Sequence, residues 1–283
     1  MSLKLMYITN KPEVAIIAEK YGVDRIWVDL EWRGKEERQK GLNTVKSNHV
    51  IEDVSNIKNC LKSSNLLVRV NSIYEESQRE IDEVIRRGAD IVMLPMFRTI
   101  DEVNRFVYLV NGRAKTMLLV ETIEAKMNLK DIVRVPGVNE IHIGLNDLHL
   151  EYKKKFMFEL LANGIIEEMC ATIKEAKIPY GFGGIARLNE GKLPAKYIIS
   201  EHYRLGSECA ILSRGFCDSS NMNIDQIEEI FRIGISEIHE YEKLIELSPK
   251  ECYTSNQKLV KDLVNNILVE INERDRKINE TRL

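Results

Sequence analysis

The stretch Lys-Thr-Met-Leu-Leu-Val-Glu-Thr-Ile-Glu-Ala (115–125), followed after a helical interval by Glu-Ile-His-Ile-Gly-Leu-Asn-Asp-Leu (140–148), decides the fold. It contains two short apolar runs, 117–120 and 141–145, and each run leads to an acid, Glu121 or Asp147. Apolar runs of this length between polar residues are typical of strands that are buried on both faces of a parallel sheet. We therefore expect two parallel strands with a helix between them.

The two acids at the ends of these strands are candidate ligands for a metal ion. Parallel α/β barrels carry their chemistry at the C-terminal ends of the strands, where Glu121 and Asp147 are expected. Neighbouring strands lie about 4.8 Å apart, so both carboxylates can reach one cation. The sequence thus predicts that Glu121 and Asp147 are a pair of ligands for one divalent metal ion. The alternative is that each acid only caps the helix that follows its strand.

The same alternation of strand and helix extends over the rest of the chain and predicts a (β/α)8 TIM barrel over residues 1–248. An open doubly wound sheet is the competing architecture. It would require a glycine fingerprint after the first strand, where the sequence has Thr-Asn-Lys-Pro (9–12). One helix is expected over 123–133, and a long helical region over 152–176, with Asn163-Gly164 as its break point. Strands are expected at 3–9, 25–31, 66–71, 90–96, 117–120, 141–145, 179–185 and 208–214.

Residues 249–283 form an additional C-terminal helix beyond the predicted barrel. An apolar stripe at helical spacing needs a surface to cover it. The helix can pack back on the barrel or on a neighbouring subunit, and we favour the second arrangement, which makes the protein a homo-oligomer. The stripe consists of Leu259, Val260, Leu263, Val264, Ile267, Leu268 and Ile271.

The composition is that of a soluble globular protein. The 283 residues are 44% hydrophobic and 30% charged, and the formal net charge of −3 gives no reason to expect nucleic acid or an anionic membrane as a partner. The sequence has no signal-peptide pattern and no apolar run near the roughly 20 residues that cross a bilayer. Its five cysteines form no Cys-x-x-Cys pair, which indicates reduced thiols, a cytoplasmic location and no structural zinc.

Several segments together resemble the HpcH/HpaI aldolase and citrate-lyase beta family of the phosphoenolpyruvate/pyruvate barrels. Each is short, but they occur in the family's order, each at a predicted strand end, and the resemblance covers about residues 1–235. The segments are Val-Asp-Leu-Glu (28–31), Val-Arg-Val-Asn (68–71), Gly-Ala-Asp-Ile-Val-Met-Leu-Pro (88–95), Val-Glu-Thr-Ile-Glu-Ala (120–125), Ile-Gly-Leu-Asn-Asp-Leu (143–148), and the glycine-containing strands at 181–184 and 206–213.

The resemblance implies a site and an activity. Glu121 and Asp147 match the family's ligands for a divalent cation, usually Mg²⁺ or Mn²⁺. Arg69 matches its substrate-contacting arginine. The turn from Gly144 through Asn146 to Asp147 matches the backbone that binds the substrate carboxylate. The implied reaction is that of a metal-dependent carbon–carbon lyase of aldolase type. It acts on a 2-oxo acid, pyruvate or oxaloacetate-like, through a pyruvate enolate, with an aldehyde as a further partner. A trimer or hexamer suits the family.

Two positions depart from the family's pattern. Its aldolases carry a histidine directly after the acid that ends the second strand, and an aspartate before the fourth strand. This chain has Trp32 and Arg86 at those positions. His49 is then the candidate base, because an imidazole titrates near neutral pH. The alternative is an exposed loop histidine.

Charged residues near the second strand leave further alternatives open. Arg69 can act on the substrate, or it can form a structural ion pair with Asp29 or Glu31, and the two roles can coexist. The long polar stretch after the second strand carries cations that suit an anionic substrate tail, or that merely form a solvated loop. They are Arg33, Lys35, Arg38 and Lys46.

Two other functions remain as alternatives to the aldolase. A citrate-lyase-like member would act on acyl-thioesters of coenzyme A and would need a groove for the pantetheine chain. A barrel without turnover would serve as a non-catalytic metal-binding module. The missing histidine and aspartate favour that second alternative.

Overall fold

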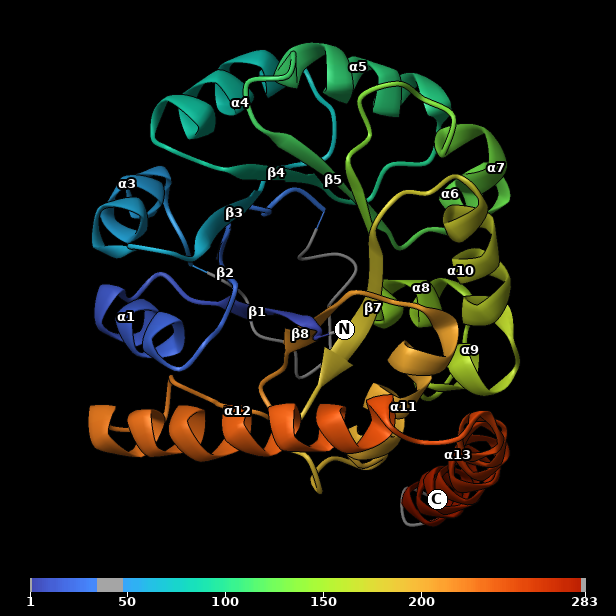
Figure 1. The fold of residues 1–283 in the computed structure, drawn as a ribbon. Coiled ribbons are helices and arrows are strands. Elements are labelled where there is room, and N and C mark those ends of the chain that lie inside the picture. The colour runs from blue at the N-terminus through green and yellow to red at the C-terminus, as the bar shows by residue number, and fades with distance from the viewer. Residues whose placement is uncertain (1, 35–47, 281–283) are drawn as a thin grey trace.

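The computed structural model describes residues 2–34 and 48–280, and within them a closed barrel of eight parallel strands that follow one another in chain order (Figure 1). This confirms the (β/α)8 barrel and excludes the open sheet. Each apolar run became a strand because its side chains are buried on both faces, inside the barrel and under the helices. The strands are β1 (Lys4–Ile8), β2 (Arg25–Asp29), β3 (Asn65–Arg69), β4 (Ile91–Leu94), β5 (Lys115–Val120), β6 (Glu140–Ile143), β7 (Tyr180–Ile185) and β8 (Cys209–Leu212).

Helices surround the barrel, and two helical expectations were wrong. The helix expected over 123–133 is two short helices that meet at Asn128. The region expected over 152–176 begins earlier, at Leu145, and consists of three helices. The expected break at Asn163-Gly164 is confirmed, with Gly164 in left-handed backbone (φ 86°), and an unexpected break follows α8 at Lys153 (φ 53°). The helices are α1 (Pro12–Lys20), α3 (Ile51–Cys60), α4 (Ser77–Arg86), α5 (Ile100–Val110), α6 (Ile123–Met127), α7 (Leu129–Ile132), α8 (Leu145–Glu151), α9 (Glu159–Ala162), α10 (Ile165–Glu175), α11 (Ala195–Leu205), α12 (Ile224–Glu246) and α13 (Lys250–Glu280).

The barrel interior is arranged in layers because alternate residues of each strand point inward. Its middle is an apolar cluster separate from the larger core between strands and helices. The register of β2 and β3 pairs Asp29 with Arg69, so these two side chains meet at the C-terminal end of the barrel. The inner cluster contains Met6, Trp27, Leu67, Ile91, Met93, Met117, Leu119 and Cys209.

An ion pair closes the N-terminal end of the barrel. Arg25, at the start of β2, donates to Glu140, at the start of β6, and the shortest N–O distance is 2.7 Å. The two side chains are only 4% and 8% exposed. A ligand that enters the barrel therefore has to come from the opposite end.

The C-terminal helix α13 packs against α9 and α11 of the same chain, at the edge of the barrel (Figure 1). Val260, Val264 and Ile267 of the predicted stripe are buried there, whereas Leu259 is 40% exposed. Within the described ranges no helix is long and apolar enough to span a bilayer. Oligomer formation stays a prediction.

Candidate active site

One cavity at the C-terminal end of the barrel brings together all the site residues that the sequence predicted. Its volume is about 730 Å³, within the range of small-molecule sites. The predicted residues come from β3, from the loop after β5, from the turn into α8 and from the segment before α3. In the described residues the lining includes Arg69, Glu121, Gly144, Asn146, Asp147 and His49.

Glu121 directly follows β5 and is 2% exposed. Its Oε1 accepts the backbone N–H of Met96 at 3.1 Å, and Met96 reaches it by adopting left-handed backbone (φ 52°). Thr122, not Glu121, caps the following helix, since its hydroxyl accepts the N–H of Ala125. The capping role that was the alternative for Glu121 therefore belongs to its neighbour.

Asp147 lies farther from the end of its strand than expected. The sixth strand ends at Ile143, and Asp147 is in the first turn of α8 rather than at the tip of the strand. The chain turns into the helix at Gly144, where a Cβ atom would lie 2.8 Å from Oε2 of Glu121. Only glycine lets the two segments approach this closely.

The two acids influence each other. Burial raises the pKa of Glu121 well above its usual value, the charges of Asp147 and Glu31 raise it further, and Arg69 opposes them. Interacting like charges in a buried place are unfavourable unless a proton or a cation intervenes.

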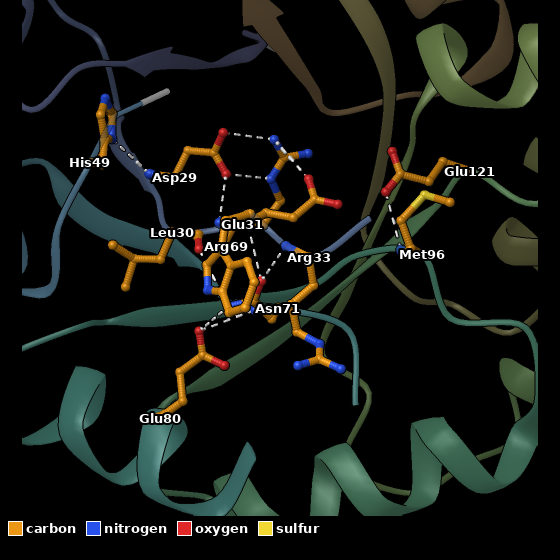
Figure 2. Close-up of polar contacts among 11 residues, drawn as sticks. Asp29, Leu30, Glu31, Arg33, His49, Arg69, Asn71, Glu80, Met96 and Glu121 are labelled. Carbon is orange, nitrogen blue, oxygen red and sulfur yellow. Dashed lines mark hydrogen bonds and ion pairs between the residues drawn. The ribbon is translucent and has the colours of Figure 1, made fainter. Parts of the chain in front are cut away.

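Arg69 is the cation at the centre of the site (Figure 2). Its Nε and Nη2 donate to the two oxygens of Asp29, each at 2.8 Å, and Nη2 also lies 3.2 Å from Glu31. Its guanidinium lies over the Trp27 ring, 5.1 Å from the ring centroid. Burial disfavours the charge, but Asp29 and Glu31 outweigh that cost and hold the pKa of Arg69 well above its usual value. The structural ion pair is therefore formed, and Nη1 is the nitrogen left for a ligand among the described contacts.

A second hydrogen-bonded group lies beside Arg69 and was missed by the sequence reasoning. Glu80 of α4 accepts from the side chain of Asn71 at 2.8 Å and from its backbone N–H at 3.2 Å. Oδ1 of Asn71 in turn accepts the backbone N–H groups of Trp32 and Arg33, both at 3.0 Å (Figure 2). Burial raises the pKa of Glu80. Asn71 was visible as part of a motif, but nothing in the periodicity of α4 marked Glu80.

The donor set fits a divalent cation held by two protein carboxylates. In the described residues no three histidine, cysteine, aspartate or glutamate side chains are grouped closely enough to hold a metal. Glu121 and Asp147 nevertheless line one cavity, and their charges interact. Mg²⁺ is commonly bound by one or two carboxylates, with substrate and water as its other ligands. Two acids beside an open cavity match that pattern.

A comparison with protein families places most of the chain in one family. The sequence model of one family, HpcH/HpaI aldolase/citrate lyase, matches residues 4–178, which include Arg69, Glu121 and Asp147. The chain belongs to this family. The activity type of the HpcH/HpaI family is that of an aldolase or citrate lyase.

Solved structures share the HpcH/HpaI fold at low sequence identity. An HpcH/HpaI aldolase from Desulfitobacterium hafniense DCB-2 is 13% identical, with a TM-score of 0.58 over 88% of this chain and 94% of that one. Citrate synthase SbnG is 16% identical, with a TM-score of 0.57 over 76% and 87%. An HpcH/HpaI aldolase/citrate lyase family protein from Burkholderia cenocepacia J2315 is 13% identical, with a TM-score of 0.56 over 75% and 88%. A comparison with curated proteins gives no match.

This member of the HpcH/HpaI family departs from the usual pattern at Trp32, which is 65% exposed, and at Arg86, which pairs with Glu83 on the surface of α4. His49 lines the cavity, and its Nδ1 accepts the backbone N–H of Asp29 at 2.9 Å. The ring proton of a neutral His49 is therefore on Nε2. Figure 2 shows His49 and Glu121 on opposite sides of Arg69.

The loop cations proposed for an anionic substrate tail divide into two groups. Lys35, Arg38 and Lys46 lie outside the described residues. Arg33 is described, and its guanidinium lies over the ring of Tyr74, 4.4 Å from the centroid. This aromatic contact accounts for the position of Arg33 without a ligand.

Proposed function

We propose that this chain is a divalent-metal-dependent carbon–carbon lyase of aldolase type that acts on a 2-oxo acid through a pyruvate enolate. The observation that supports it best is the convergence of Glu121, Asp147 and Arg69 on one cavity at the C-terminal end of the barrel. Membership of the HpcH/HpaI family supports the reaction type. Mg²⁺ or Mn²⁺ and a pyruvate-like or oxaloacetate-like acid are the proposed cofactor and substrate.

Glu121 and Asp147 are the residues that would hold the cation. A bound divalent cation acts as a Lewis acid toward the keto oxygen of the substrate. The hydrogen bond from Met96 fixes one oxygen of Glu121 and leaves Oε2 on the side of Gly144. Glu121 is therefore positioned before a ligand arrives, so little reorganisation is needed when the ligand binds.

Arg69 supplies fixed positive charge where the substrate becomes more negative. Breaking the bond beside the keto group leaves charge on the keto oxygen, and a guanidinium in a fixed orientation stabilises it. Asp29 and Glu31 fix that orientation and keep Arg69 protonated. The ion pair thus prepares Arg69 for a ligand rather than replacing that role.

The turn into α8 is proposed to bind the substrate carboxylate. The N–H of Gly144 already donates to the carbonyl of Val120 at 2.9 Å, so it is not available. The next N–H groups, from Leu145 to Asp147, belong to the first turn of a helix and lack intrahelical acceptors. They are the donors we assign to the carboxylate, and Gly144 contributes by leaving space. His49 is the proposed proton-transfer group.

Exchange of the pyruvate methyl protons with solvent deuterium tests the proposal, because it requires the same proton removal without a second substrate. We expect wild-type protein with Mg²⁺ or Mn²⁺ to catalyse the exchange. Glu121→Gln should slow it at least about 10²-fold, the scale of losing one preorganised electrostatic group.

Glu270→Gln is the matched control, since Glu270 is exposed on α13 and the chemical change is the same. It should exchange like wild type. Equal exchange in wild type and Glu121→Gln, or no exchange with any divalent cation, contradicts the proposal.

A further inference from the structure

The cavity has two walls of different chemistry. The segments after β6 and β7 contribute most of the apolar side chains of the cavity, beside Asn146, Asp147 and Lys192. The loops after β1 and β8 contribute mostly polar side chains. The apolar wall comprises Leu145, Phe156, Met157, Phe158, Leu193 and Ile198.

The aromatic part of the apolar wall lies in a loop, where polar residues are the norm. Phe156 and Phe158 are 9% and 7% exposed, and their rings contact edge to face with centroids 5.4 Å apart. Oε1 of Glu159 accepts the backbone N–H groups of Lys155 and Phe156 at 2.8 and 3.0 Å. The ring contact and the two hydrogen bonds thus fix the conformation of the loop, so the apolar wall exists before a ligand binds.

The apolar wall begins beside the proposed metal ligands. Leu145 follows Gly144 and precedes Asp147 by two residues. Gly183 of β7 has left-handed backbone (φ 56°), and a Cβ atom there would lie 2.6 Å from Cδ1 of Leu145. The backbone of β7 therefore passes close to Leu145, and Leu145 lines the same cavity as Asp147 and Phe156.

The opposite wall is polar and carries charges of both signs, because Lys11, Arg214 and Asp218 all line it. Nζ of Lys11 donates to the carbonyl oxygen of Ser219 at 3.1 Å, which holds this side chain against the loop after β8. Asp218 adds a negative charge to the same wall, and its pKa is lowered by hydrogen bonds from Ser220 and Asn221 and by the charge of Arg214.

We infer that the substrate is a 2-oxo acid whose carbon chain beyond the keto group is apolar, and that the wall from Leu145 to Ile198 binds this chain. This inference rests on the proposed function, because it concerns the second half of the same substrate. A cavity of about 730 Å³ leaves ample room for that half once a three-carbon acid lies at Arg69.

Calorimetric binding of a series of 2-oxo acids tests the inference without turnover. In the presence of Mg²⁺, Kd should fall about fourfold with each methylene from 2-oxobutanoate to 2-oxohexanoate, the increment for burying one methylene group. 2-Oxohexanoate should bind more tightly than 2-oxoadipate, which has the same chain length and a terminal carboxylate. A Kd that does not change with length, tighter binding of 2-oxoadipate, or no binding of any member overturns the inference.

A pair of methionine variants locates the effect. Met157→Gln places an amide in the apolar wall and should reduce the increment per methylene to below about twofold. Met127→Gln makes the same change on α6 at a residue that is 74% exposed, and it should keep the wild-type increment. An unchanged increment in both variants overturns the assignment to this wall. Deuterium exchange of pyruvate, measured separately, reports on the proposed function, so either idea can fail while the other stands.

Discussion

The two ends of the barrel each bury an arginine against carboxylates, yet only one end is open. At the N-terminal end Arg25 meets Glu140, and their side chains are 4% and 8% exposed. At the C-terminal end Arg69 faces Asp29 and Glu31, with Glu121 near enough to influence its charge. The first pair closes the barrel, whereas the second lines a cavity. The comparison teaches that surplus carboxylates and adjoining space, rather than a buried ion pair as such, mark the candidate site.

The largest effect is expected at the closed end. Arg25→Met leaves Glu140 buried without its main partner, because Lys115, the other cation paired with it among the described residues, is 4.0 Å away and 66% exposed. Breaking a buried pair in this way costs about 3–5 kcal/mol of unfolding free energy, measured by urea denaturation. The double variant Arg25→Met/Glu140→Met should regain most of that loss. A cost below about 1 kcal/mol for the single variant would show that this end does not depend on the pair.

The open end should respond in rate more than in stability. Arg69→Lys keeps the charge beside Asp29 and Glu31 but loses the planar fork of donors. Metal-dependent deuterium exchange of pyruvate should therefore fall about 10²–10³-fold. The unfolding free energy should change less than in Arg25→Met. A variant that loses stability but keeps its exchange rate would make Arg69 a structural residue like Arg25.

The layer between the two ends predicts a pH dependence. His142 lies on β6 between Glu140 and Gly144, its Nε2 bonds to the carbonyl of Gly183, and burial lowers its pKa from 6.5 to about 4. In the unfolded chain His142 therefore binds a proton below about pH 6.5, whereas in the folded chain it stays neutral down to about pH 4. Stability should fall over this range as pH falls, by about 3 kcal/mol from His142.

Urea denaturation at pH 7, 6, 5 and 4 measures this dependence. His142→Gln should reduce the slope without removing it, because burial also lowers the pKa of His202, to about 3. A slope that is the same in wild type and variant would mean that His142 is accessible to protons in the folded state.

The sequence revealed the barrel and its acids better than it revealed their supports. Apolar runs such as 117–120 are strong signals because burial on both faces leaves no choice of residue type. The error over 152–176 arose because Phe156 and Phe158 continue an apolar pattern through a loop in which they face the cavity. Asp147 was expected at the tip of a strand because the apolar run 141–145 continues past Ile143, where β6 ends, into the first residue of α8. The role of Glu80 was not predicted because its hydrogen bond to Asn71 joins a helix to a loop, and such a contact produces no hydrophobic periodicity in the sequence.

The hydrogen bonds that Asn71 and the backbone of Asp29 make to the chain on either side of residues 35–47 have a consequence for this part of the barrel. Before residue 35, the backbone N–H groups of Trp32 and Arg33 donate to Oδ1 of Asn71. After residue 47, Nδ1 of His49 accepts the backbone N–H of Asp29. Both sets of hydrogen bonds lie at the C-terminal ends of the paired strands β2 and β3, and Arg69 is the last residue of β3. The orientation of Arg69 is set by Asp29 and Glu31 and not by these flanking contacts alone, so the position of the guanidinium and the entry and exit of the chain around 35–47 are specified by separate hydrogen bonds.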